Sequence, residues 1–292
     1  MVASIEQIHL HRFCSASLLL SSIPTYLITR YMVTAPFGRH VSTTKSPWWY
    51  GPKINPRLSW FIFECPNLIW SWYWCWHRND DSILFLESSG DENLIPSNTL
   101  LICMFALHYV NRAIVYPLRM SPNSQSVPLV VTTSAVIFTA FNGYIQCFYL
   151  GHIEKLAPLD LSRHGGLSRN NIQKLLGIFI FVVGMGINIY ADGVLRDLRS
   201  KNNDKADTTS NRRYYIPRDL VFTYISCPNF TGEIIEWFGY AMASQFSLPS
   251  VAFFCYTASN LIPRGVAHHN WYKRKFEDYP MERKWAVIPF IA

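Results

Sequence analysis

Long apolar stretches alternate with short polar and charged segments over nearly the whole chain. A helix that crosses the hydrocarbon core of a bilayer needs about 20 mainly apolar residues. Seven segments approach this length, although several contain polar residues and the last is short. The pattern therefore predicts an all-α membrane protein, a bundle of about seven transmembrane helices at residues 13–33, 57–76, 97–118, 127–150, 172–195, 220–244 and 246–262.

The charges of the connecting segments follow this alternation. Segment 34–56 carries only basic charges, segment 196–219 carries seven Arg or Lys and fewer Asp, and the tail after residue 263 is rich in Lys and Arg. Segment 77–96, in contrast, has five acidic residues and one Arg. With seven spans the basic segments share one side. The positive-inside rule then predicts a lumenal N-terminus and a cytosolic C-terminus.

Composition supports a membrane protein. Half of the 292 residues are hydrophobic and 15% are charged, against about 25% charged in soluble domains. We attribute the net charge of +7 to membrane topology and expect no nucleic-acid partner. The seven cysteines form no CxxC pair and lie mostly in apolar stretches, so we expect neither a disulfide framework nor a metal site. Segment 13–33 is interpreted as a retained helix rather than a cleaved signal peptide.

Polar side chains recur at spacings of three and four inside several predicted helices, which places each set on one helical face. Ionisable groups within a membrane are costly and usually face a cavity. Together with Glu64 in the second helix, the four sets predict one polar cavity that opens at the cytosolic, Arg-rich side. The sets are Tyr109, Arg112 and Tyr116; Asn188, Asp192, Arg196 and Arg199; Asn229, Glu233, Glu236 and Tyr240; and Arg264, His268, Tyr272 and Lys275.

The residue types indicate what such a cavity holds. Arginine offers fixed paired donors to phosphate, and the carboxylates suit ribose hydroxyls or amides, or pair with the arginines. Glu64 is either catalytic or a structural carboxyl that bonds to a neighbouring helix. Gly184 and Gly186 resemble the start of a dinucleotide-binding loop, but they lie within an apolar helix and favour close helix packing instead. Motifs of serine hydrolases, zinc proteases and P-loop kinases are absent.

Six motifs give the chain a family resemblance. The sequence is similar to the steroid 5α-reductase (3-oxo-5α-steroid 4-dehydrogenase) family from residue 37 to residue 290. The motifs are FGRH at 37–40, LHYVNRAIVYP at 107–117, FNGYIQ at 141–146, GMGINI at 184–189, NFTGEIIEWFGYA at 229–241 and FEDYP at 276–280.

The resemblance implies a single membrane reductase domain over residues 1–292, with steroid-side helices in about 1–126 and a cofactor-binding part in about 127–292. It implies a multi-pass protein of the endoplasmic reticulum membrane that acts as a monomer. NADPH enters from the cytosol and a steroid or steroid-like lipid from the bilayer.

The resemblance also implies roles for single residues. Hydride passes from the nicotinamide to C5 of a 3-oxo-Δ4-steroid, while Glu64 and Tyr109 bind the 3-oxo group. Donors at that oxygen stabilise charge as it develops, so Glu64 is expected to be neutral and to act as a donor. The cofactor contacts implied by the motifs are Arg112, Tyr116, Asn188, Asp192, Arg199, Asn229, Glu233, Arg264, His268 and Tyr272.

The chain departs from the family pattern at several positions. Cys65 replaces a Leu, the pair Tyr190-Ala191 replaces His-Ser, and Tyr215 replaces an Arg for which Arg212, Arg213 or Arg218 substitutes. These changes leave two alternatives open. One is a reductase of the same fold that acts on another enone or enoyl lipid, such as a polyprenol, an enoyl-thioester or a sterol. The other is a non-catalytic membrane scaffold or transporter.

Overall fold

Seven long helical segments make up most of the computed structural model. It describes residues 3–32, 48–76, 94–121, 124–162, 168–203 and 215–289, without the side chains of Trp76 and residues 199–203. Most of the predicted charged loops, the FGRH motif, Arg212 and Arg213 lie outside the described residues.

The elements follow one another in a simple order. The long helices are α1 (Ile5–Leu27), α2 (Pro56–Trp76), α3 (Ser97–Val110), α5 (Leu129–Phe148), α6 (Arg169–Asn203), α7 (Pro228–Ala243) and α8 (Leu248–Lys275). The π-helix η4 (Asn111–Val115) and the helix α4 (Tyr116–Arg119) continue α3. The remaining elements are η1 (Ile28–Met32), η3 (Trp48–Tyr50), β1 (Lys53–Ile54), β2 (Leu94–Ile95), β3 (Val127–Pro128), η5 (Tyr149–Ile153), β4 (Leu159–Asp160) and η6 (Leu220–Phe222).

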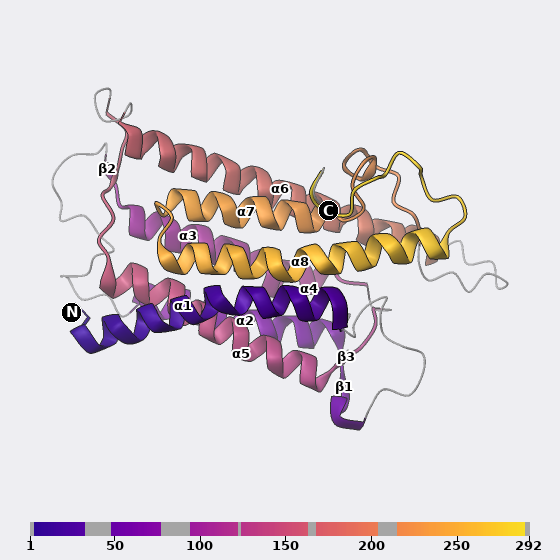
Figure 1. The fold of residues 1–292 in the computed structure, drawn as a ribbon, viewed down its shortest axis with the longest axis horizontal. Helices are drawn as coiled ribbons and strands as arrows, with labels where there is room; N and C mark the ends of the chain where they lie inside the picture. Colours follow the sequence, from indigo (N-terminus) through magenta and orange to yellow (C-terminus); the bar gives the residue numbers. More distant parts are fainter. Residues whose placement is uncertain are drawn as a thin grey trace.

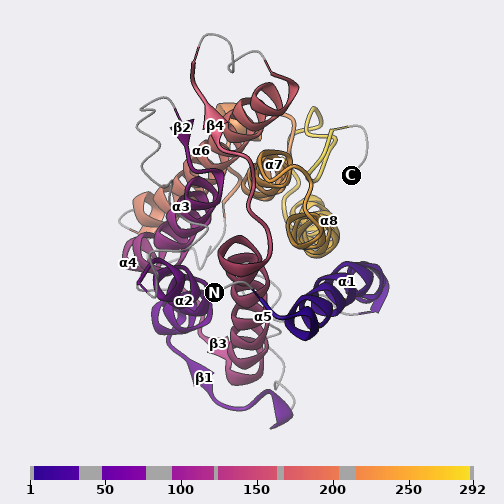
Figure 2. The same ribbon diagram turned by 90° about the vertical axis from the view of Figure 1, so that its left-hand side faces the viewer.

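Consecutive long helices run in opposite directions, so their connections alternate between the two ends of the bundle (Figure 1). β1 pairs antiparallel with β3 at one end, and β2 pairs antiparallel with β4 at the other. The end-on view shows α6 beside α7 and α2 beside α5, with α1 on the outside next to α8 (Figure 2). Of the parts that the structure describes, β1 and the C-terminal end of α8 lie at the same end of the bundle (Figure 1).

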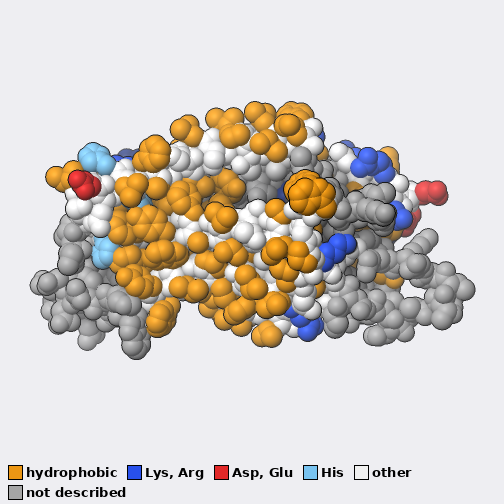
Figure 3. Space-filling view, turned by 90° about the horizontal axis from the view of Figure 1, so that it is seen from below, with side chains coloured by type: hydrophobic (Ala, Val, Ile, Leu, Met, Phe, Trp, Pro, Cys, Tyr) orange, Lys and Arg blue, Asp and Glu red, His pale blue; other side chains and the backbone are white. Residues whose placement is uncertain are grey.

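Apolar side chains cover much of the face of the bundle that Figure 3 shows. Ile137, Phe179 and Val182 are each more than half exposed, and soluble monomers rarely expose apolar patches of such extent. Three helical segments are long and apolar enough to cross a membrane by length and composition: Ser97–Arg119, Leu129–Ile153 and Arg169–Leu198. The prediction of seven helices is therefore confirmed for the described chain, whereas only these three meet that criterion for a span.

Several helix boundaries differ from the predicted spans for local reasons. α1 starts earlier than predicted because Ser4 and Gln7 form a reciprocal capping box at its first turn. α7 starts later because Pro228, which has no N–H to donate, occupies its first turn, and the preceding residues form the short helix η6 and a loop. α8 extends to Lys275, well past the predicted end at 262.

Glycines bring α6 and α7 into backbone contact. A Cβ atom added to Gly184 would lie 2.3 Å from the backbone nitrogen of Glu236, and one added to Gly232 would lie 2.5 Å from that of Asn188. Gly177 of α6 and Gly239 of α7 likewise lie against the backbone of the other helix, further along the same interface. Only glycine allows helices to approach this closely. The predicted packing role is thus confirmed for Gly184, but it is wrong for Gly186, which has nothing within 4 Å.

The contrast between Gly184, which lies against α7, and Gly186, which does not, provides a test of the packing. We expect Gly184→Ala to lower the free energy of unfolding by about 1–3 kcal/mol, because the atoms that it would meet are backbone atoms that cannot move aside. Gly186→Ala, two residues away on the same helix, is the matched control and should leave stability unchanged or slightly raised. Thermal unfolding of the two detergent-purified variants measures both effects. Equal midpoints for the two variants would contradict the close approach of α6 and α7.

Candidate functional site

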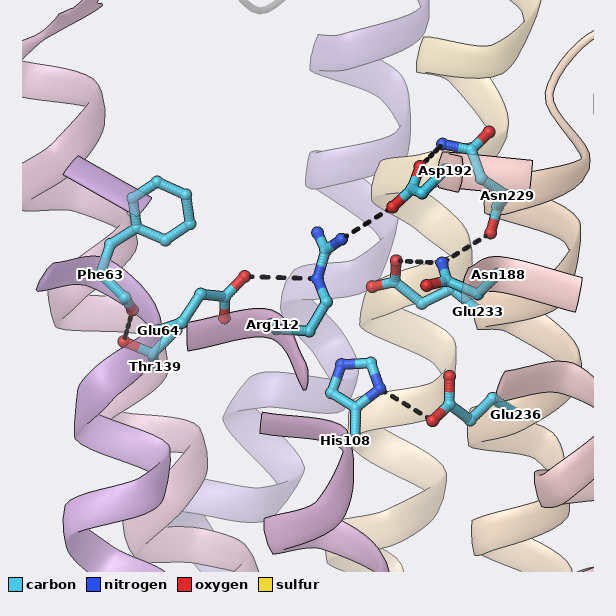
Figure 4. A network of polar contacts seen from close by, with 10 residues as sticks. All are labelled: Phe63, Glu64, His108, Arg112, Thr139, Asn188, Asp192, Asn229, Glu233 and Glu236. Carbon is cyan, nitrogen blue, oxygen red and sulfur yellow. Dashed lines mark hydrogen bonds and ion pairs between the residues drawn. The ribbon is translucent and has the colours of Figure 1, made fainter. Parts of the chain in front are cut away.

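The Arg112 guanidinium lies between polar side chains of α2 and those of α6 and α7 (Figure 4). Its Nε lies 3.7 Å from Oε1 of Glu64 on α2, and its Nη1 lies 3.3 Å from Oδ2 of Asp192 on α6. All three side chains are about nine-tenths buried. One arginine thus joins two carboxyl groups that are far apart in the sequence. The structure brings these polar side chains together, while the cavity itself stays a prediction.

Aromatic rings and a local change of helix type fix the position of this arginine. The guanidinium carbon lies 5.0 Å from the ring centres of both Trp60 and Tyr116, a distance that favours cation–π attraction. Arg112 itself belongs to the π-helix η4, and π-helical turns recur at functional sites. Pro117 lies two residues after the end of η4 and has no N–H for the regular helical bond, a local cause of helix distortion.

A second group of amides and carboxylates links α6 to α7. The Asn188 amide donates to the backbone oxygen of Asn229 at 2.9 Å and to Oε2 of Glu233 at 3.4 Å. The Asn229 amide donates to Oδ1 of Asp192 at 3.0 Å. Four of the predicted cofactor contacts therefore form one hydrogen-bonded set. We call this set, together with Glu64 and Arg112, the central network: Glu64, Arg112, Asn188, Asp192, Asn229 and Glu233.

Tyr109 lies next to the central network in a cluster of aromatic rings. It is 4% exposed and packs against Phe105, His108 and Trp237, with ring centres 4.7, 4.9 and 6.1 Å away. Glu64 and Tyr109, both in the described part of the chain, make no direct hydrogen bond to each other. The two residues that the family resemblance assigns to the 3-oxo group therefore come from adjoining helices without forming a pair of their own.

The predicted residues of α8 gather at the start of α7. The Arg264 guanidinium lies 5.4 Å from the ring centre of Phe230, and the His268 ring lies 5.6 Å from the same ring. Phe230 follows Asn229 of the central network, so these two candidates lie close to it. Tyr272 is buried, and its ring stacks on the ring of Tyr279 with 5.7 Å between the ring centres.

Some predicted residues lie elsewhere. The Arg196 side chain pairs with its exposed neighbour Asp197, and Lys275 is exposed, so neither joins the central network. The side chain of Arg199 is outside the described part of the chain. Arg218, one suggested replacement for the arginine that this family has at Tyr215, pairs instead with Asp278 at the surface.

The residue pair that replaces the family's His-Ser does not face the network. Tyr190 is half exposed and donates to Asp219, just before η6. Ala191 is fully buried in the core. These two departures therefore bear on packing around the site rather than on the central network itself.

Sequence reasoning missed a buried pair formed by His108 and Glu236. Nδ1 of His108 lies 2.8 Å from Oε1 of Glu236, and the two side chains are 4% and 0% exposed. Glu236 was predicted to share the polar face of its helix, but His108 was not a candidate. The sequence could have identified His108 as a candidate, because it lies four residues before Arg112 and this spacing puts both side chains on one helical face.

Beyond the predicted end of the last span, hydrogen bonds join the terminal segment to α8 and to the residues just before α7. Ser226 Oγ lies 2.5 Å from Nδ1 of His269 and 2.6 Å from the Tyr279 hydroxyl. Burial, with smaller contributions from the charges of Lys273 and Arg283, lowers the pKa of His269 from 6.5 to about 4. His269 is therefore neutral at physiological pH and joins these segments as a neutral hydrogen-bonding group.

Comparison with known proteins places these features in a family. The model of the 3-oxo-5-alpha-steroid 4-dehydrogenase family matches residues 125–292. The chain is 38% identical to the steroid 5-alpha-reductase DET2 of Gossypium hirsutum over 97% of each chain. It is 37% identical to the 3-oxo-5-alpha-steroid 4-dehydrogenase 1 of Rattus norvegicus over 89% of this chain and 87% of the other.

The human 3-oxo-5-alpha-steroid 4-dehydrogenase 1 is 33% identical over 87% of this chain and 85% of its own. A family model over more than half of the chain, and relatives aligned over most of it, agree with the motifs. The chain belongs to the steroid 5α-reductase family of oxidoreductases.

The lowered pKa of His269 predicts a specific pH dependence. Below pH 6.5 the unfolded chain binds a proton at this residue, whereas the folded chain does not until about pH 4. The stability contributed by neutral His269 is therefore fully present above pH 6.5 and is lost as pH falls toward 4. We expect the thermal midpoint of the wild type to fall more steeply between pH 7 and pH 5 than that of His269→Gln. Parallel curves for the two proteins would show that His269 is not held neutral by the fold.

Proposed function

We propose that this protein reduces the Δ4 double bond of a 3-oxo-Δ4-steroid to the 5α-dihydro product, with NADPH as the reductant. Membership of the steroid 5α-reductase family and the names of its relatives support the reaction class. The observation that carries the proposal is the convergence of Glu64, Arg112 and Asp192 in a buried site between α2 and α6.

The donor set fits a nicotinamide dinucleotide. Amides and carboxylates at Asn188, Asp192, Asn229 and Glu233 suit the hydroxyl groups of ribose and the carboxamide. The guanidinium groups of Arg112 and Arg264 suit phosphate oxygens. The bound cofactor supplies the hydride, and the residues of this chain hold it and shield the site from water.

Glu64 and Tyr109 then bind the 3-oxo group of the steroid. Hydride addition at C5 drives negative charge onto that oxygen, and a hydrogen-bond donor placed there stabilises the charge as it forms. A donor role requires Glu64 to be neutral, although an arginine beside a carboxyl group favours the charged form. Arg112 is closer to Asp192, at 3.3 Å, than to Glu64, at 3.7 Å. In our proposal Asp192 therefore balances the charge of Arg112 and Glu64 keeps its proton.

The same proposal includes the orientation in the membrane. The bundle end that carries the C-terminus of α8 and the start of α7 is cytosolic, and α1 begins on the lumenal side of the endoplasmic reticulum membrane. This places Arg264 and His268 where a soluble cofactor arrives, while the steroid comes from the bilayer. The chain acts as a monomer and needs no nucleic acid.

Substitution of the two residues at the 3-oxo group tests the mechanism. We expect Glu64→Gln and Tyr109→Phe each to lower kcat with a 3-oxo-Δ4-steroid by about 10²–10³-fold, the usual effect of removing one oxyanion donor. Glu154→Gln, at an exposed glutamate, is the matched control and should retain full activity. NADPH oxidation with progesterone or testosterone, with products identified by mass spectrometry, gives the rates. Wild-type turnover in both folded variants would refute the assigned roles.

Cofactor choice is a separate prediction. NADPH should raise the thermal midpoint of the purified protein, and NADH should do so much less, because the arginines at the cytosolic end select for the extra phosphate. We expect Arg264→Met to weaken NADPH binding by about 10-fold or more, the effect of one lost charge-assisted hydrogen bond. Arg119→Met, at an exposed arginine on α4, should leave binding unchanged. Equal stabilisation by NADPH and NADH would overturn the choice of cofactor.

A further inference from the structure

The buried pair of His108 and Glu236 has no part in the function proposed above. Its hydrogen bond of 2.8 Å joins α3 to α7 one helical turn below Arg112 (Figure 4). Buried titratable side chains in contact are costly for a membrane helix and mark functional sites. The pair also lies beside Tyr109, which is proposed to bind the 3-oxo group, so it is placed close to the proposed reaction.

The two ring nitrogens of His108 face different surroundings. Nδ1 is engaged by the Glu236 carboxyl, which fixes the ring orientation. The second nitrogen, Nε2, lies on the side of the ring that faces Glu64 and Arg112 (Figure 4). Neighbouring rings restrain this orientation further, because Trp237 lies 4.6 Å and Tyr109 lies 4.9 Å from the imidazole centre. A carboxyl group that holds a histidine so that its other nitrogen faces a reacting centre is a recurring arrangement in acid–base catalysis.

The carboxyl group of Glu236 has an unused oxygen. Oε2 is buried and has no hydrogen-bond partner in the described part of the chain, although buried polar atoms are almost always bonded. An unpartnered oxygen can accept a proton without breaking an existing bond. The pair therefore has room for two protons, one shared between Nδ1 and Oε1 and a second at either Oε2 or Nε2.

We propose that His108 and Glu236 form a dyad that delivers the proton consumed by the reduction. This inference rests on the proposed function. Reduction of the double bond needs one hydride at C5, which NADPH supplies, and one proton at C4. The dyad starts with two protons and releases one from Nε2 of His108 toward the steroid enolate held at Glu64 and Tyr109, and that proton ends on C4.

After release, the remaining proton stays between Nδ1 and Oε1. The dyad takes a new proton from water once the product has left. His108 is thus the proton donor, and Glu236 is a positioning residue that sets the tautomer of His108 and stores charge. No oxidant or reductant beyond NADPH is needed.

The test separates proton delivery from binding. We expect Glu236→Gln and His108→Gln each to lower kcat by about 10²-fold, the typical contribution of general acid catalysis, while the Kd for NADPH changes less than about 2-fold. The solvent deuterium isotope effect on kcat should increase in Glu236→Gln, because proton transfer becomes slower than the other steps. Its pH profile should also lose the fall in rate at high pH that deprotonation of the donor causes.

The control is another buried histidine. His11 on α1 is 2% exposed and bonds to the backbone oxygen of Ile145 at 2.8 Å, far from the dyad in the sequence. His11→Gln should change stability without changing the isotope effect. Wild-type kcat and isotope effect in a folded Glu236→Gln variant would overturn the dyad. Failure of the wild type itself to oxidise NADPH with any 3-oxo-Δ4-steroid would instead overturn the proposed function.

Discussion

The close approach of α6 and α7 sets the geometry on which the site depends. Gly184 meets the backbone at Glu236, and Gly232 meets the backbone at Asn188, so the glycine contacts and the functional side chains share the same turns. Helices held this close leave little freedom for the side chains between them. The hydrogen bonds that Asn188 and Asn229 form across the interface follow from this separation. A protein without these glycines could carry the same polar residues and still not bring them together.

Charge is the second constraint. Arg112 lies near Glu64 and Asp192, and Glu233 bonds to the Asn188 amide in the same network. Acidic groups thus outnumber the arginine within this buried set, an arrangement that suits protonation of one carboxyl or the arrival of a ligand with donors. An isolated charge in a membrane costs much free energy. When opposite charges lie together, each lowers the cost of burying the other.

Helical periodicity predicted much of this arrangement because it reports the direction of a side chain from its own helix axis. It correctly placed Asn188, Asp192, Asn229 and Glu233 on facing sides of two helices. It could not show that Arg196 pairs with Asp197, since a partly exposed side chain can bond to its neighbour in the sequence instead of to another helix. Nor could it identify His108 as the partner of Glu236, because pairing between helices depends on their relative rotation and depth, which the pattern along one chain does not contain.

The π-helical turn at Asn111–Val115 has a consequence for how this family can vary. Such a turn contains one residue more than a regular helical turn. The widened turn takes up that extra residue locally, so the helix on either side of it keeps nearly the direction that a regular helix one residue shorter would have. Loss of one residue here would therefore leave the bundle much as it is, but it would close the turn that contains Arg112 and move its guanidinium from its place between Glu64 and Asp192. The extra residue thus determines the position of the arginine rather than the course of the helix.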